Sequence, residues 1–149
     1  MIETPPLVSV IATSYSMERL GDLTALLDSL EKQTYHDCEI IVVLEKSQEL
    51  LDRITEYVRQ KGYANVRLLF NSGLGGLSAA RNLGIKNARG TILAFIDDDA
   101  VATPDWLENI VKTFQDNDNI VGVTGAITPL WETQEMSGFQ RNSIGFLPA

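Results

Sequence analysis

The chain has 149 residues, 44% of them hydrophobic and 21% charged, and a formal net charge of −8. This length and composition are typical of one globular domain, and the acidic excess argues against nucleic acid as a partner, because phosphate backbones are bound by basic surfaces. No apolar run approaches the roughly 20 residues of a membrane-spanning helix, so we expect no membrane segment in this chain. The single cysteine, Cys38, excludes an internal disulfide and fits a cytoplasmic protein.

Short apolar runs and amphipathic segments alternate along most of the chain. The apolar runs predict strands at residues 7–12, 38–44, 66–70, 91–96 and 120–127, and the run at 91–96 reads as buried on both faces. Between them, apolar residues recur at spacings of three and four, which predicts helices around residues 20–30, 50–61, 77–88 and 106–114. The second helix is expected to stop near Gly62.

Alternating strands and helices of this length predict a doubly wound, mostly parallel α/β sheet with helices on both faces. Gly84, inside the third predicted helix, is expected to permit close packing on the sheet. The periodicity ends after Thr128, so we divide the chain into a domain over residues 1–127 and an irregular tail over residues 128–149. The tail is either an irregular edge of the domain or the start of a further part of a longer protein.

Three adjacent aspartates follow the apolar run at residues 92–96. Burial of unpaired carboxylates is very costly, so Asp97, Asp98 and Asp99 must lie where the strand leaves the sheet. In open α/β sheets, ligands bind at these carboxyl ends of the strands. In an extended chain Asp97 and Asp99 share one side and Asp98 faces the other. Two converging carboxylates favour a hard cation, so we predict Mg²⁺ or Mn²⁺.

A second interpretation is a solvated loop in which the aspartates cap the next helix. Thr103 and Pro104 already supply a helix start, with threonine at the cap and proline at the first helical position. The aspartates are not needed for that task, which favours a role with a metal or a phosphate.

A glycine-rich loop at residues 71–76 precedes the third predicted helix. It is a poor dinucleotide fingerprint, because Ser78 stands at the third glycine position and the loop follows the third strand rather than the first. Gly75 and Gly76 still allow a ligand to approach the backbone and the N–H groups at the helix start. Arg81, one turn into that helix, is placed either to bind a phosphate or to pair with a surface carboxylate.

Polar residues also stand at the ends of the first two predicted strands. They are Thr13 and Tyr15 after the first strand and Glu45 after the second. Parallel strands end at one edge of a sheet, so these residues should lie near the aspartates. Tyr15 is suited to stack on a nucleobase, and Glu45 to accept a hydrogen bond from a base or ribose. The alternative is that each is a turn residue exposed to water.

Several segments together resemble the family 2 glycosyltransferases, which have the GT-A fold. In the order of that family they are residues 8–15, Gln33-Thr34-Tyr35, residues 39–45, residues 80–85, residues 95–99 and Pro104. The resemblance covers about residues 7–127. It implies an inverting, metal-dependent transfer from a nucleotide diphosphate-sugar to a sugar or lipid-linked acceptor. The expected donor is a UDP-sugar, and a GDP-sugar or dTDP-sugar is the alternative.

The same resemblance implies roles for the predicted site residues. The base and the ribose would be held by Thr13, Tyr15 and Glu45. Asp97 and Asp98 would lie near the ribose and the donor sugar. Asp99 would bind Mg²⁺ or Mn²⁺ at the diphosphate, where the metal acts as a Lewis acid on the departing nucleotide.

Two departures from the family pattern affect these expectations. The family often has two adjacent acids after the second strand, but here the first is Leu44, which leaves Glu45 alone and puts the common uridine pattern in question. An inverting transferase also needs a general base, which the family places in a later motif. Nothing after Ile127 resembles that motif, and Glu132 and Glu135 lack its context. We therefore expect the donor-binding part of a longer enzyme, with the catalytic base unassigned.

Two alternative functions stay open. One is a nucleotide-sugar-binding or scaffold domain without catalysis. The other is a phosphatase of the haloacid dehalogenase type, with Asp97 as nucleophile and Asp99 as acid. That motif normally opens its domain and needs a later lysine, and Lys112 is the sole lysine after these aspartates.

Overall fold

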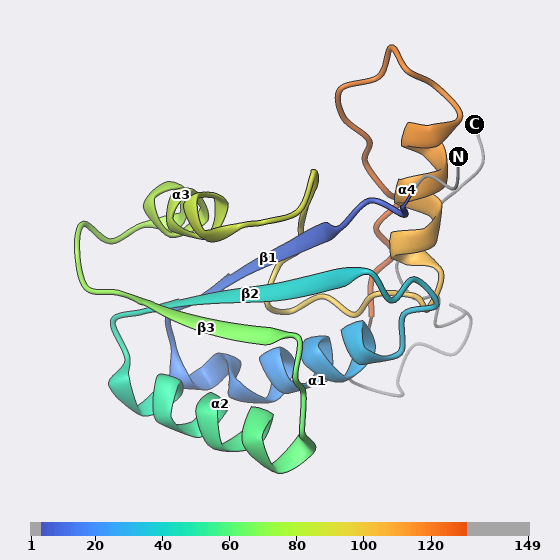
Figure 1. The fold of residues 1–149 in the computed structure, drawn as a ribbon. Helices are drawn as coiled ribbons and strands as arrows, with labels where there is room; N and C mark the ends of the chain where they lie inside the picture. Colours follow the sequence, from blue (N-terminus) through green and yellow to red (C-terminus); the bar gives the residue numbers. More distant parts are fainter. Residues whose placement is uncertain (1–3, 131–149) are drawn as a thin grey trace.

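The computed structural model describes residues 4–130, and its centre is a four-stranded parallel sheet (Figure 1). The strands are β1 (Val8–Ser14), β2 (Cys38–Glu45), β3 (Val66–Asn71) and β4 (Ile92–Phe95). They lie side by side in the order β3-β2-β1-β4, so β1 pairs with β2 on one side and with β4 on the other. Because all pairs are parallel, the strands end at the same edge of the sheet.

Helices cover both faces of this sheet. They are α1 (Leu20–Glu31), α2 (Gln48–Lys61), α3 (Leu77–Asn87) and α4 (Trp106–Gln115), with a short 3-10 helix, η1 (Met17–Arg19), before α1. Figure 1 shows α1 and α2 along one face and α3 on the other. The helices α1, α2 and α4 share the larger buried cluster, whereas α3 buries Ala80 against Ile11, Ile41 and Val43. The predicted doubly wound α/β class is confirmed. None of the helices in residues 4–130 is long and apolar enough to span a bilayer.

Gly84 lies where α3 crosses β1 and β2. A Cβ atom at this position would lie 2.6 Å from Cγ2 of Ile11 and 3.5 Å from Cγ2 of Val43. The first distance is well inside van der Waals contact, so any larger residue would push the helix away from the sheet. The expected close packing at Gly84 is confirmed.

The ends of α2 follow the sequence signals. The hydroxyl of Ser47 accepts a hydrogen bond from the Leu50 N–H at 3.1 Å, and so caps the helix start. At the other end Gly62 adopts a φ of 69°, the left-handed conformation that glycine takes most easily.

The apolar pattern correctly predicts α4 around residues 106–114, but the start at Pro104 that the Thr103 capping pattern predicts lies two residues too early. The helix begins at Trp106, with Asp105 at the cap position and no side-chain capping bond. The preceding residues are held as a turn against the end of α1. The Gln33 side chain donates to the carbonyl oxygen of Thr103 at 2.6 Å, and the Thr34 N–H donates to that of Pro104 at 2.8 Å. These tertiary hydrogen bonds override the local capping pattern.

The strand predicted at residues 120–127 is wrong. The structure has no strand there, and in residues 4–130 the only strand that pairs with β4 is β1. Val121 is 100% exposed and Ile127 is 80% exposed. An apolar run indicates a tendency to extend, but a strand also needs a hydrogen-bonded neighbour. Residues 128–130 form neither helix nor strand, and the rest of the predicted tail lies outside the described residues.

The sequence predicted that the fourth strand is buried on both faces, and this prediction is wrong. Leu93 is 39% exposed and Phe95 is 43% exposed, whereas Ala94 between them is buried. The cause is the position of α3, which packs on β1, β2 and β3 and leaves β4 at the open edge of the described sheet.

Candidate functional site

A cleft of about 320 Å³ lies at the carboxyl ends of β1, β2 and β4. It brings together most of the predicted site residues, namely Thr13, Tyr15, Glu45, Gly76, Asp97, Asp98 and Asp99. Two others lie at its margin. A Cβ on Gly75 would be 3.7 Å from Oε2 of Glu45, and Arg81 reaches the Asp97 carboxylate from α3. The parallel order of the strands therefore gathers residues that are far apart in the sequence.

The three aspartates face different parts of the protein. Asp97 pairs with Arg81 of α3 at 3.4 Å, Asp98 accepts a hydrogen bond from the Ser14 hydroxyl at 2.6 Å, and Asp99 pairs with Arg19 of η1 at 3.3 Å. The chain turns at Asp98 and Asp99, and the Ala100 N–H donates to the Asp97 carbonyl oxygen at 3.1 Å. The chain is therefore no longer extended at these aspartates, so the alternation of an extended strand does not determine their directions, and all three line one cleft.

Asp98 is the most enclosed of the three carboxylates. Burial raises its pKa, against the opposing effects of the Ser14 hydroxyl and the Arg19 charge. Asp97 and Asp99 are more open, with 68% and 54% of their side chains exposed. Two accessible carboxylates thus flank one that the fold partly encloses.

Arg19 is a residue of the site that the sequence interpretation missed. Its guanidinium contacts both Asp22 and Asp99 at 3.3 Å. The hydrogen bond to Asp22, together with the charges of Asp98 and Asp99, raises the pKa of Arg19. The available signal was an arginine in the first turn after the polar end of β1, but nothing local indicates that β4 ends beside it.

Glu45 ties the glycine-rich loop to the end of β2. Its carboxylate is buried and accepts from the Gly76 N–H through both oxygens, each at 3.1 Å. The Asn71 side-chain amide donates to the same carboxylate at 3.1 Å and to the Leu74 carbonyl oxygen at 3.0 Å. In this arrangement the Glu45 oxygens are occupied by the loop. The Gly76 N–H likewise points to Glu45 rather than to an open space.

The start of α3 is nevertheless suited to an anion. Gly76 stands at the cap position with a φ of 121°, which favours glycine, and it has no side chain that could cap the N–H groups that follow, although its own N–H is bound by Glu45. The first N–H groups of a helix lack partners within the helix and carry partial positive charge. The cleft therefore opens on a helix N-terminus as well as on carboxylates.

Lys46 is a second site residue that the sequence interpretation did not include. It lies in the cleft wall directly after β2, and its Nζ is 5.3 Å from the centroid of the Tyr15 ring. Tyr15 itself is 56% exposed, so one face of an aromatic ring at the cleft is covered by an ammonium group. The contact joins the ends of β1 and β2.

The cleft offers an open set of donors to a divalent cation. Within residues 4–130, no three His, Cys, Asp or Glu side chains lie close enough to enclose a metal ion. Asp97 and Asp99 offer two exposed carboxylates. Mg²⁺ is commonly held by one or two carboxylates, with substrate phosphate oxygens and water completing its shell. The residues fit a cation that binds together with a phosphate group, and they do not form a closed protein site.

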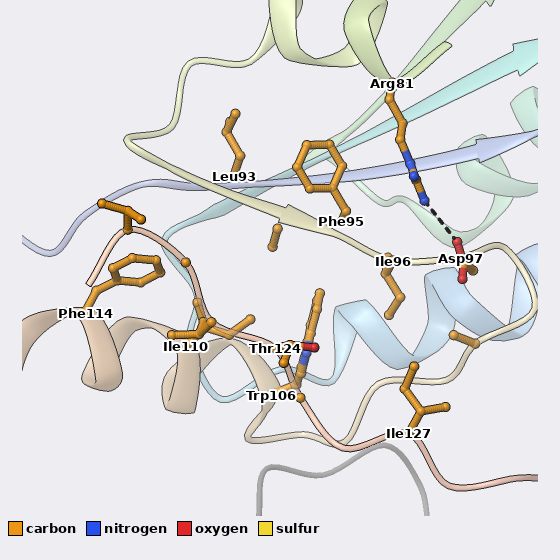
Figure 2. Close-up of a pocket in the computed structure, with 16 residues that line it drawn as sticks. Arg81, Leu93, Phe95, Ile96, Asp97, Trp106, Ile110, Phe114, Thr124 and Ile127 are labelled. Carbon is orange, nitrogen blue, oxygen red and sulfur yellow. Dashed lines mark hydrogen bonds and ion pairs between the residues drawn. The ribbon is translucent and has the colours of Figure 1, made fainter. Parts of the chain in front are cut away.

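A second cavity of about 430 Å³ adjoins the aspartates on the side of β4 (Figure 2). Figure 2 shows Phe95 and Leu93 of β4 above it, with Trp106 and Ile110 of α4 below. The Arg81 guanidinium lies 5.9 Å from the Phe95 ring centroid while it pairs with Asp97. Asp97 lines both the cavity and the polar cleft, so the two spaces meet at this residue.

The parallel α/β sheet with its helices matches solved structures of GT-A glycosyltransferases. The structure of Staphylococcus aureus TarS residues 1–349 has a TM-score of 0.65 and 27% identity, over 83% of this chain and 38% of that one. The same TarS fragment has also been solved in complex with UDP-GlcNAc. The mannosyltransferase PcManGT from Pyrobaculum calidifontis, in complex with GDP-Man and Mn²⁺, has a TM-score of 0.67 at 24% identity, over 74% of this chain and 33% of that one, and supports the fold alone.

The profile of Glycosyl transferase family 2 matches residues 9–146, and the chain belongs to this family. The glucosyl-dolichyl phosphate glucuronosyltransferase of Haloferax volcanii is 34% identical over 132 residues, which are 89% of this chain and 42% of that protein. The uncharacterized glycosyltransferase EpsJ of Bacillus subtilis is 36% identical over 118 residues, 78% of this chain and 33% of that protein. The chain thus spans about two fifths of the former and a third of the latter. Family membership leaves the phosphatase alternative without support.

Proposed function

We propose that this chain binds a nucleotide diphosphate-sugar, with Mg²⁺ or Mn²⁺, in the cleft at the carboxyl ends of β1, β2 and β4. The protein to which it belongs would then transfer the sugar with inversion to a sugar or lipid-linked acceptor. The observation that carries the proposal is the convergence of Tyr15, three aspartates and the α3 N-terminus on one cleft in a chain of this family.

The chemistry of the cleft residues supports distinct roles. Thr13 and Tyr15 would hold the ribose and the base, with the exposed Tyr15 ring as the stacking surface. Asp98, which the fold holds through Ser14, would face the ribose and the donor sugar with Asp97. Glu45 would act mainly by fixing the glycine loop, since its carboxylate already accepts from Gly76.

The diphosphate would lie between the acidic turn and α3. Asp99 and Asp97 would hold the cation, which supplies Lewis-acid stabilisation to the departing nucleotide. The N–H groups at Gly75 and at the α3 start, together with Arg81, would neutralise the remaining phosphate charge. Arg81 and Arg19 now pair with Asp97 and Asp99, so the two arginines would exchange a carboxylate for the ligand.

A UDP-sugar is our first choice of donor and a GDP-sugar the second. TarS, which is 26% identical in its UDP-GlcNAc complex, supports the first choice. The Haloferax relative is named for a lipid-phosphate acceptor, which supports a lipid-linked acceptor here. We place the catalytic base outside residues 4–130 and the site of action in the cytoplasm, where a lone thiol such as Cys38 stays reduced.

Nucleotide-sugar binding without transfer is the second candidate function. It is favoured by one observation: the carboxylates that line the cleft each have a partner in the chain. Asp97 pairs with Arg81, Asp98 with Ser14, Asp99 with Arg19 and Glu45 with Gly76. None of these groups stands ready as a general base.

Calorimetric titration of UDP and GDP, with and without Mn²⁺, tests the donor site. We expect binding that needs the metal and is lost in Asp99→Ala, while Asp52→Ala, an exposed carboxylate on α2, binds as the wild type does. Equal binding without metal, or binding unaffected by Asp99→Ala, would remove Asp99 from the metal role. If neither nucleotide binds, the donor-site proposal is wrong.

A further inference from the structure

Lys46 has an unusual backbone conformation for its residue type. Its φ is 66°, and no other non-glycine residue within residues 4–130 has a positive φ. The left-handed region is unfavourable for a residue with a Cβ, and such strain persists only where the surroundings impose it. A glycine at this position would carry no such cost. The presence of a lysine therefore needs a reason other than the turn.

The neighbours of Lys46 hold it in place from both sides. Glu45 is buried and bound to Gly76, and Ser47 caps α2 through the Leu50 N–H. The Ser47 N–H also donates to the Glu45 carbonyl oxygen at 2.8 Å, which closes a tight turn around Lys46. The direction of the Lys46 side chain thus follows from the fold.

That direction takes the Lys46 side chain along the cleft wall. A Cβ on Gly75 would lie 3.6 Å from Cε of Lys46, and the ammonium ends 5.3 Å from the Tyr15 ring centroid. The side chain therefore runs from the glycine-rich loop to the ring that our proposed function assigns to base stacking.

Lys46 differs from the other two cationic side chains at the site in its ion pairing. Arg19 pairs with Asp99 and Arg81 pairs with Asp97. Lys46 forms no ion pair with any residue of the described part of the chain, and its one described polar interaction is with the Tyr15 ring. An ammonium group only donates hydrogen bonds, so the base region presents three N–H donors. Glu45, the nearby acceptor, is occupied by Gly76.

We propose that Lys46 is a specificity determinant for the nucleobase of the donor. When a base stacks on Tyr15, the Lys46 ammonium would leave the face of the ring that it now covers and donate a hydrogen bond to a ring carbonyl oxygen of the base. Uracil and guanine offer such an oxygen, whereas adenine has none. This inference rests on the proposed function, and it names bases with a ring carbonyl as the class that the site selects.

The test compares UDP and ADP binding, in the presence of Mn²⁺, in the wild type and in three variants. Lys46→Met keeps the length of the stem and removes the donors, Lys46→Gly also relieves the backbone, and Lys46→Arg keeps a charged donor. Lys61→Met is a matched control, because Lys61 lies at the same 5.3 Å from the Tyr57 ring on α2, away from the cleft.

We expect the wild type to prefer UDP over ADP. The UDP affinity should fall about tenfold in Lys46→Met and Lys46→Gly, as expected for a lost charged hydrogen bond, with ADP affinity unchanged. Lys46→Arg should keep most of the preference, and Lys61→Met should match the wild type. The thermal midpoint of Lys46→Gly should equal or exceed that of the wild type, which separates lost binding from unfolding.

Three results would overturn the inference in different ways. Unchanged UDP affinity in Lys46→Met would leave the ammonium as a surface contact of Tyr15 only. An equal loss of UDP and ADP affinity would mean that Lys46 contacts the phosphates, which both nucleotides share, and not the base. If the wild type binds neither nucleotide, the proposed function itself fails, and the base role fails with it.

Discussion

The carboxylate of Glu45 accepts the backbone N–H of Gly76 through both of its oxygens, each at 3.1 Å. This contact joins the end of β2 to the first residue before α3, across 31 positions in the sequence. It fixes the glycine-rich loop against the sheet edge where the aspartates lie. The loop is therefore connected to the strand ends, between which we propose that the ligand binds.

Removal of the Glu45 carboxylate should weaken both the fold and the site. In Glu45→Ala the Gly76 N–H and the Asn71 amide lose their acceptor, which costs about 1–3 kcal/mol for buried polar groups left unpaired. UDP affinity should fall as well, because the loop is released. Urea unfolding and calorimetry measure the two effects. Glu49→Ala, at an exposed position in the first turn of α2, is the control. An equally stable Glu45→Ala would show that the loop is held by other contacts.

Two glycines in helices should respond to alanine in opposite directions. Gly84→Ala places a Cβ 2.6 Å from Ile11 and should lower the free energy of unfolding by about 1–3 kcal/mol through overpacking. A Cβ added at Gly21, in α1, would meet no atom within 4 Å, so Gly21→Ala should raise the free energy of unfolding by about 0.5–1 kcal/mol through helix propensity. Chemical denaturation of both variants checks the pair, and a stable Gly84→Ala would mean that α3 shifts without cost.

The sheet was predictable from the sequence because its signals are local. Each strand is a short apolar run, each helix has a repeating apolar face, and parallel order places all strand ends at one edge. That is why Tyr15, Glu45 and the aspartates could be assigned to one site before any contact was known. The close packing at Gly84 followed from the same logic, because a glycine inside a helix needs a reason.

The errors arose where distant contacts decide the structure. Residues 120–127 are as apolar as a strand, but pairing with a neighbour is not encoded in the run itself. The capping pattern at Thr103 does not start the helix, because the Thr103 carbonyl oxygen instead accepts a hydrogen bond from Gln33, which is 70 positions away. Arg19 and Lys46 were missed because their partners, Asp99 and Tyr15, come from other strands.

Substitution of Asp98 should affect the free energy of unfolding and the UDP affinity differently. Burial raises its pKa, so the fold disfavours the carboxylate, and the stability that the neutral form gives is lost as the pH rises through the folded pKa. Asp98→Asn keeps an acceptor for the Ser14 hydroxyl and removes the charge. At pH 7 the variant should be at least as stable as the wild type in urea, while its UDP affinity falls about tenfold. Asp118→Asn, exposed beyond α4, should change neither quantity.

The opposite end of the sheet should control the response to acid. Glu39 is buried at the start of β2, where it accepts from the Ser9 hydroxyl and the Arg89 N–H, both at 2.7 Å. Burial raises its pKa, but these hydrogen bonds and the charges of Arg67 and Arg89 outweigh that effect and lower it below 4.5. The unfolded chain then binds the proton more tightly, so the stabilisation is present above pH 4.5 and is lost as the pH falls toward the folded pKa.

Glu39→Gln should therefore flatten the acid side of the stability curve. At pH 7 the variant should be less stable than the wild type by about 1–3 kcal/mol, because a charge-assisted network is weakened. The difference should shrink as the pH is lowered, since the protonated glutamate resembles the amide. Urea unfolding between pH 3 and pH 7 measures both curves, with Glu49→Gln as the exposed control. Parallel curves for Glu39→Gln and the wild type would mean that other carboxylates carry the pH dependence.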